Sequence, residues 1–212
     1  MKIALVGISG NIGSQIALEA QKRGHAVTGI SRRAAPATGG ELASIPTVTA
    51  DIFDHQALAE AVRGHDVLAS AFGPAPDAIS TVPEAARALV AAARAAGIKR
   101  VIVVGGAGSL EVAPGVQLVD TPGFPDMYKP YALAHREALA VLQDASDLDW
   151  TFFAPAAEIG PGEKKGQFRV GARKLITDAS GHSKISYGDY ADAFVSEIEA
   201  GHYLKEIATV AY

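Results

Sequence analysis

The stretch VGISGNIG, residues 6–13, lies between an aliphatic run and an amphipathic one. Three known motifs have glycines at a junction of this kind: a nucleophile elbow, a triphosphate-binding loop and a dinucleotide-binding turn. An elbow needs Gly-x-Ser-x-Gly, but here a glycine follows Ser9 at once. A triphosphate loop needs Gly-Lys-Ser/Thr, but no lysine follows Gly13. The spacing of Gly7, Gly10 and Gly13 favours the dinucleotide turn, with a permissive strand-to-helix connection as the alternative.

This turn predicts a binding site for a cofactor pyrophosphate. Glycines allow the backbone to approach the phosphates closely, and the amides at a helix start carry a partial positive charge. We therefore expect contacts with the cofactor from Gly7, Ser9, Gly10, Asn11, Ile12 and Gly13.

The pattern around the turn predicts the fold. Short aliphatic runs alternate with amphipathic stretches, as in parallel strands that are joined by crossover helices. Strands are expected at residues 2–6, 26–30, 47–50, 67–71, 100–104 and 150–153, and helices at residues 11–23, 55–63, 80–96 and 131–146. Six parallel strands in this order predict an α/β doubly wound sheet of the NAD(P)-binding Rossmann type. We expect one domain over residues 1–212.

The second half of the chain is less regular. Residues 105–126 contain five glycines and three prolines, which predicts a long loop. Residues 160–186 predict short hairpin strands, centred on residues 168–170 and 174–176, over the open edge of the sheet. A helix at residues 188–199 and a strand at residues 207–211 would follow, and this C-terminal region would form the substrate side.

The end of the second strand bears on the choice of cofactor. NAD enzymes place an acid there to hold the ribose 2′-hydroxyl, but this chain has Ser31, Arg32 and Arg33. Serine and arginine can donate hydrogen bonds to a 2′-phosphate, which a carboxylate would repel. We expect a preference for NADP(H), with NAD(H) possible. The alternative is that an arginine faces solvent.

Two further strand ends supply candidate cofactor contacts. Asp51 and Ile52 follow the third strand, where a carboxylate could accept a hydrogen bond from the adenine, although Asp51 could equally cap a helix. Ala71, Phe72 and Gly73 follow the fourth strand, where a glycine leaves room for the ribose.

Ordinary short-chain reductases carry Tyr-x-x-x-Lys after the fifth strand, and none of the tyrosines here has a lysine four residues later. The nearest substitute is Tyr131 with His135, four apart on one helix face. This pair is a candidate catalytic relay, with a packing role as the alternative.

A family resemblance appears in three motifs: the glycine turn, the run VVGGAGSL at residues 103–110 and the run SYGDYA at residues 186–191. The chain resembles atypical short-chain dehydrogenase/reductases of the NAD(P)H-binding type, especially the NADH-flavin reductases, with biliverdin reductase B and flavin reductase as more distant relatives. The resemblance implies that Ser109 lies beside the nicotinamide, as a candidate catalytic residue, and that Pro155 shapes the pocket wall. A tight loop would also use serine at position 109.

The missing Tyr-Lys pair bears on the reaction. A ketone needs a proton donor when it accepts hydride, whereas a flavin or quinone delocalises the charge and takes its proton from water. We therefore expect an oxidoreductase that reduces a flavin or quinone-like substrate, with flavin not tightly bound. The alternative is a non-catalytic NADP(H)-binding regulator or redox sensor.

The composition of the chain limits the partners, metal sites and cellular location that we expect. A net charge of −4 gives no field that would attract nucleic acid, so a small molecule is the expected partner. The chain has no cysteine, and its histidines lack metal-ligand spacing, so we expect no metal site. The first apolar run is broken before it reaches signal-peptide length, and none is long enough for a membrane span. We expect a cytoplasmic protein, as a monomer or homodimer.

Overall fold

The computed structural model describes residues 1–32 and 40–212. Its main sheet has eight strands in the order β10-β12-β8-β5-β4-β1-β2-β3, and all neighbours are parallel except the antiparallel pair β10–β12. The predicted doubly wound α/β fold is confirmed. The strands are β1 Lys2–Val6, β2 Ala26–Ser31, β3 Thr47–Thr49, β4 Val67–Ser70, β5 Arg100–Val104, β8 Asp149–Ala154, β10 Arg169–Ala172 and β12 Glu206–Ala211.

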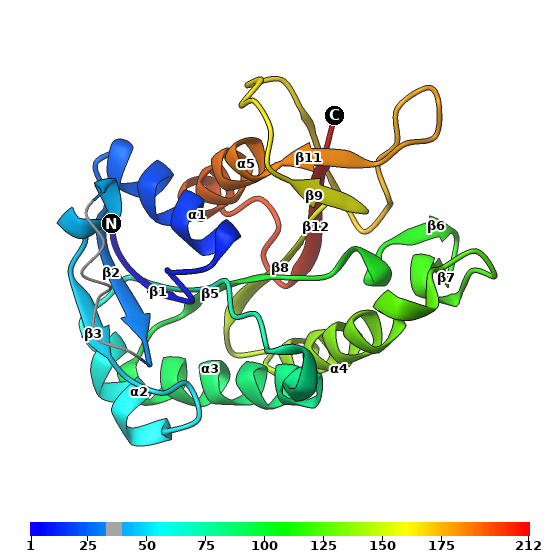
Figure 1. The fold of residues 1–212 in the computed structure, drawn as a ribbon. Helices are drawn as coiled ribbons and strands as arrows, with labels where there is room; N and C mark the ends of the chain where they lie inside the picture. The colour runs from blue at the N-terminus through cyan, green and yellow to red at the C-terminus, as the bar shows by residue number, and fades with distance from the viewer. Residues whose placement is uncertain (33–39) are drawn as a thin grey trace.

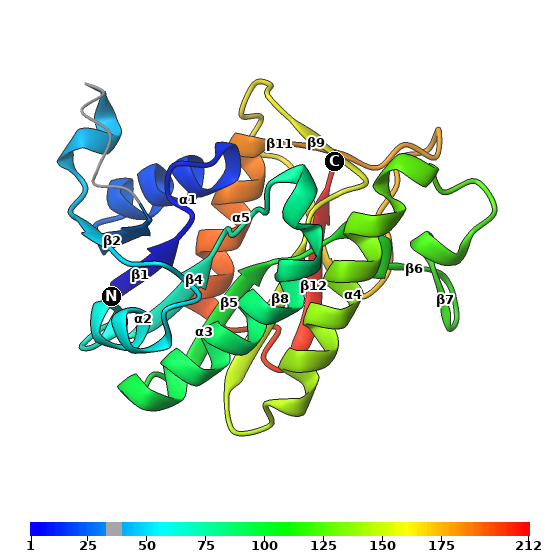
Figure 2. The ribbon, with the colours of Figure 1, turned by 60° about the horizontal axis from the view of Figure 1, so that its bottom comes forward.

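Helices cover both faces of this sheet (Figure 1). Helices α1 (Asn11–Lys22) and α5 (Tyr187–Ala200) lie on one face, and α2 (His55–Val62), α3 (Val82–Ala96) and α4 (Lys129–Asp144) lie on the other. Figure 2 shows α3 and α4 side by side along their face. Each layer buries its own apolar cluster against the sheet, as the period of each amphipathic stretch predicts. Within the described residues, no helix is long and apolar enough to cross a membrane.

The predicted long loop at residues 105–126 proves to be structured. It contains the short helices η3 (Ala107–Ser109) and η4 (Leu118–Asp120) and the antiparallel pair β6 (Glu111–Ala113) and β7 (Val116–Gln117). Gly115 turns the chain between β6 and β7 with a φ of 74°, a conformation that favours glycine. A third short helix, η5 (Asp126–Tyr128), leads into α4, while η1 (Glu41–Ser44) and η2 (Pro76–Thr81) precede β3 and α3.

The predicted hairpin at residues 160–186 is wrong. Strand β10 lies within this region, but it pairs with β12 and so covers the edge of the main sheet. Strands β9 (Glu158–Gly160) and β11 (Lys184–Ser186) pair in parallel as a separate small sheet. The segment 174–176 forms no strand, and Lys174 makes only an isolated bridge to Glu111. The last strand, β12, is parallel to β8, so the main sheet has seven parallel strands rather than six.

Buried aromatic side chains attach α5 to the centre of the sheet. The ring of Phe153 in β8 lies edge-on to Tyr190 and Phe194 of α5, with ring centroids 5.5 and 5.7 Å away. The Tyr190 hydroxyl donates a 2.6 Å hydrogen bond to the carbonyl of Phe153. Because α5 starts beside the carboxyl ends of the strands, this contact also places the first turn of α5.

A buried ion pair fixes the other end of α5. Arg100 of β5 donates to Glu197 at 3.0 Å, and the Glu197 side chain is only 3% exposed. The same carboxylate accepts hydrogen bonds from the backbone amides of His202 and Tyr203, which follow the helix. The pair therefore joins the sheet, the helix and the chain leading to β12.

We predict that Glu197→Ala lowers the free energy of unfolding by about 3–5 kcal/mol, because Arg100 would be left buried without its counter-charge. Urea denaturation followed by circular dichroism measures the change. The matched control is Glu60→Ala, which breaks an exposed pair with Arg63 and should cost far less. Equal losses in the two variants would contradict the role assigned to the buried pair.

Candidate functional site

The glycine turn brings three backbone segments together. Gly7 has a φ of 83°, and a Cβ on it would lie 2.5 Å from the carbonyl oxygen of Ala71. A Cβ on Gly13 would lie 2.1 Å from the carbonyl oxygen of Gly7. Both distances are too short for any side chain. Only glycine at these two positions allows the backbone to approach so closely. The contacts bring together the end of β1, the first turn of α1 and the end of β4.

The first turn of α1 is open toward an anion. Gly10 is the N-cap residue, with φ −77° and ψ 165°, and no side chain caps the helix. The first turn contains no acidic residue. The leading amides of a helix lack partners within it and form the positive end of its dipole. Since Gly10, Asn11 and Ile12 line a cleft, this turn suits a phosphate group.

That cleft has a volume of about 590 Å³ and follows the carboxyl ends of β1, β2, β4, β5 and β8. Its size is typical of a cofactor site, and its place is where ligands bind in open α/β sheets. The residues predicted from the sequence that line it are Gly7, Ser9, Gly10, Asn11, Ile12, Ser31, Arg32, Ile52, Ala71, Phe72, Gly73, His135 and Pro155. Gly13 lies behind the turn, where it allows the close contact with Gly7.

The second strand ends at the cleft with a hydroxyl and a guanidinium. Ser31 is half-buried and Arg32 is exposed, and both line the wall. Arg33, the other arginine expected to hold a 2′-phosphate, lies outside the described residues. The fit to a dinucleotide therefore includes a positive charge at the end of β2, where an acid would favour NAD.

Asp51 and Ile52 both follow β3, but their side chains point differently. Ile52 is buried in the cleft wall, whereas Asp51 is exposed and is not among the lining residues. The Asp51 carboxylate accepts a 3.0 Å hydrogen bond from the amide of Phe53 and so closes a local turn. Asp54 caps α2 through a 3.0 Å bond from the amide of Ala57. Asp51 thus neither caps this helix nor lines the cleft.

Apolar and aromatic groups form the far end of the cleft, next to β5 and β8. The residues that line this end are Gly105, His135, Pro155, Ile159 and Tyr187. Sequence reasoning missed Ile159 and Tyr187 as lining residues. The signal for Tyr187 was its place at the junction of a strand and a helix, since β11 ends at Ser186 and α5 starts at Tyr187.

His135 reaches this end from α4 and is uncharged at neutral pH. Burial lowers the pKa of its imidazole to about 4. The ring lies edge-on to Phe152, with centroids 6.3 Å apart. Gly106 leaves room for it, because a Cβ there would lie 3.0 Å from the Cβ of His135.

The other two candidate catalytic residues lie away from the wall. Ser109 is 1% exposed in η3, and its hydroxyl has no hydrogen-bond partner within the part of the chain that the structure describes. Tyr131 lies in the first turn of α4 and is not among the residues lining the cleft. Of the proposed relay, only His135 lines the cleft. Within residues 1–32 and 40–212 no group of acidic residues and histidines could hold a metal ion.

Known proteins with similar sequences and structures share this architecture. Residues 7–200 match the NAD(P)H-binding protein family. The uncharacterized protein YwnB of Bacillus subtilis (strain 168) is 40% identical over 213 residues, covering 99% of this chain and 98% of that protein. A crystal structure from Burkholderia pseudomallei, named a putative exported protein, is 56% identical with a TM-score of 0.93 over the full length of both chains.

A crystal structure from Streptococcus pneumoniae TIGR4, named a putative NADH-flavin reductase, is similar to this chain as well. It is 34% identical with a TM-score of 0.89, and the match covers 100% of this chain and 99% of that one. The family match begins at Gly7 and spans the glycine turn and the cleft walls described above. The chain therefore belongs to the NAD(P)H-binding family of Rossmann-fold proteins.

Proposed function

We propose that this chain is an NAD(P)H-dependent reductase that transfers hydride to a flavin or a quinone-like acceptor. The observation that carries the proposal is the composition of the far end of the cleft, where Pro155, Ile159 and Tyr187 face the space beside a neutral His135. Such walls suit a flat, apolar ring. The name of the similar Streptococcus pneumoniae protein points in the same direction.

The chemistry that a reductase of this kind needs from its side chains is modest. When bound, NAD(P)H supplies the hydride. The glycine turn and the first turn of α1 would hold the phosphates, and the apolar end of the cleft would align the acceptor ring, so proximity would provide most of the rate. A flavin or quinone spreads the added charge over its ring system and takes its proton from water, so no buried acid is required.

His135 adds a hydrogen-bonding group without adding a charge. A neutral imidazole has one N–H donor and one acceptor, so it can donate to a ring carbonyl of an acceptor. A protonated, positively charged imidazolium at the same place would instead favour the binding of an anion. The low pKa of His135 therefore leaves a neutral donor and acceptor beside this end of the cleft.

We predict that the protein oxidises NADPH with FMN, riboflavin or a small quinone at least about a hundredfold faster than with a simple ketone, because a ketone lacks its proton donor here. Absorbance at the nicotinamide band under anaerobic conditions measures the rates, and the same mixtures without protein are the control. Ketone turnover without flavin or quinone turnover would contradict the proposal. No turnover with any acceptor would favour a non-catalytic NADP(H)-binding regulator.

We further propose that the preferred cofactor is NADP(H). Ser31 and Arg32 line the cleft at the end of β2, and the adjoining chain up to Arg32 offers no carboxylate to the ribose. A guanidinium pairs well with a phosphate and can stack on an adenine ring.

We predict that Arg32→Ala weakens NADPH binding by about tenfold or more and changes NADH binding by less than about threefold, because only NADPH carries the 2′-phosphate. Calorimetric titration of both cofactors measures the constants. Arg63→Ala, which removes an exposed arginine at the end of α2, is the matched control and should bind both cofactors as the wild type does. Tighter wild-type binding of NADH than of NADPH would overturn the preference.

A further inference from the structure

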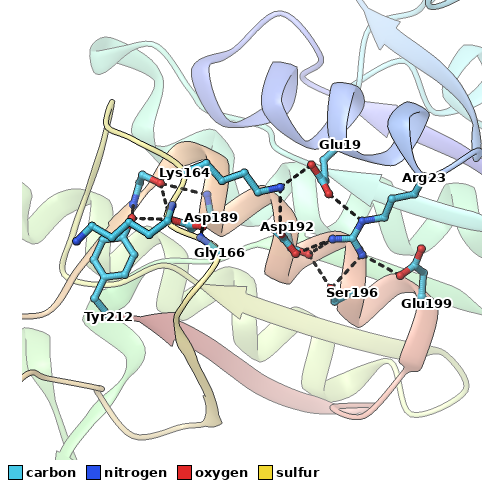
Figure 3. Close-up of polar contacts among 11 residues, drawn as sticks. Glu19, Arg23, Lys164, Gly166, Asp189, Asp192, Ser196, Glu199 and Tyr212 are labelled. Carbon is cyan, nitrogen blue, oxygen red and sulfur yellow. Dashed lines mark hydrogen bonds and ion pairs between the residues drawn. The ribbon is translucent and has the colours of Figure 1, made fainter.

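A fully buried carboxylate gathers four hydrogen bonds beside the apolar end of the cleft. Asp189 of α5 is 0% exposed. It accepts from the backbone amides of Lys165 and Gly166, each at 2.8 Å, from the Ser186 hydroxyl at 3.1 Å and from the Tyr212 hydroxyl at 2.6 Å. Figure 3 shows Asp189 of α5 together with Tyr212 and with Gly166 of the 161–168 segment, which connects β9 to β10.

This arrangement differs from an ordinary helix cap. In a capping box, the acid three residues into the helix accepts from the backbone amide of the N-cap residue. Here the N-cap residue Ser186 accepts from the Asp189 amide at 3.1 Å, but its own amide donates to the Tyr212 hydroxyl at 3.2 Å. Because Tyr212 takes over that amide, the Asp189 carboxylate is available to hold the 161–168 segment.

The carboxylate is ionised at neutral pH in spite of its burial. Desolvation alone would raise the pKa of Asp189. The hydrogen bonds from Tyr212 and from the amides of Lys165 and Gly166 outweigh that effect and leave the pKa below its usual value. Each of these bonds is therefore to a charged acceptor, and such bonds are stronger than neutral ones.

A second contact joins the same segment to the helix of the glycine turn. The Lys164 ammonium lies 2.8 Å from Glu19 of α1 and 2.8 Å from Asp192 of α5 (Figure 3). Arg23 continues this network, with ion pairs to Glu19 at 2.9 Å and to Asp192 at 2.6 Å. Lys164 also packs closely on the first turn of α5, because a Cβ on Gly188 would lie 3.3 Å from its Cβ.

These contacts flank the two cleft residues that come from the C-terminal part of the chain. Tyr187 lies between the cap residue Ser186 and Gly188, two residues before Asp189. Strand β9 leads directly into the held segment, and its central residue Ile159 pairs with Ile185 of β11. The small β9–β11 sheet has only three residue pairs, so its position depends on contacts of this kind.

We propose that Asp189, with Tyr212, is a positioning residue that holds the 161–168 segment and keeps Tyr187 and Ile159 at the acceptor end of the cleft, where they set the affinity for a flat ring. The inference rests on the proposed function. Asp189 and Tyr212 lie outside the glycine turn that would hold the cofactor. Their contacts with the 161–168 segment therefore affect the binding of the acceptor and leave the binding of the cofactor unchanged.

The test uses Tyr212→Phe in the whole chain. This variant removes one hydroxyl and keeps the ring, over which the Lys165 ammonium lies at 3.9 Å. Tyr203→Phe is the matched control, since Tyr203 follows the far end of α5, and Asp189→Asn is the second variant. We measure tryptic cleavage after Lys164 or Lys165 by mass spectrometry, the NADPH dissociation constant, and the KM for FMN, riboflavin and a small quinone.

For Tyr212→Phe we expect cleavage at least about fivefold faster and a KM for the best acceptor raised at least about fivefold, as one lost hydrogen bond to a carboxylate predicts. The NADPH constant should change by less than about twofold, and Asp189→Asn should show the same pattern more strongly. Cleavage and KM equal to those of Tyr203→Phe would overturn the inference. So would equal weakening of NADPH and acceptor, which indicates a general structural role.

The outcomes for this inference and for the proposed function are separate. A wild-type protein that turns over no acceptor would refute the proposed function, and the positioning role would fail with it. Acceptor turnover that Tyr212→Phe leaves unchanged would refute the positioning role alone.

Discussion

The close approach of backbone at Gly7 and Gly13 is the constraint on which the rest of the structure depends. A side chain at either position would overlap a carbonyl oxygen, at 2.5 Å from Ala71 or at 2.1 Å from Gly7 itself. With glycine in both places, α1 starts directly behind the end of β1, and its first residues line the cleft. A phosphate site of this kind needs no charged side chain, because helix amides and their dipole supply the positive potential.

The two ends of the cleft are built by different physical means. The cofactor end is made of backbone packed at the centre of the sheet, and its shape follows from glycine and from parallel pairing. The end proposed for the acceptor depends in part on two side chains outside the main sheet, Ile159 of β9 and Tyr187 at the start of α5. The β9–β11 ladder beside them has only three residue pairs and gives little support. Buried polar contacts at Asp189 and the ion pairs of Lys164 supply what the ladder lacks.

Local signals predicted the cofactor half well. Aliphatic runs, amphipathic period and glycine spacing are properties of neighbouring residues, so β1, α1 and β5 have nearly the predicted bounds. The acceptor half depends on contacts between residues far apart in the chain. Tyr212 meets Asp189 across 23 positions and Lys164 meets Glu19 across 145. No pattern among neighbouring residues predicts such pairs. For the same reason, sequence reasoning could not tell that Ile52 lines the cleft while Asp51 does not, since the Phe53 amide decides where that carboxylate points.

The central claim, that the first turn of α1 holds the phosphates of NAD(P)H, is tested most directly by a calorimetric titration of NADPH into Gly10→Asp, with Gly10→Asn as the neutral control. Gly10 has ordinary N-cap angles, and a Cβ there would meet its nearest neighbour at 3.4 Å, so both side chains are accommodated and both suit an N-cap. The account predicts that the aspartate variant is at least as stable as the wild type yet binds NADPH at least about tenfold more weakly than the asparagine variant, because its carboxylate repels the phosphates. Equal affinity in the two variants would contradict it.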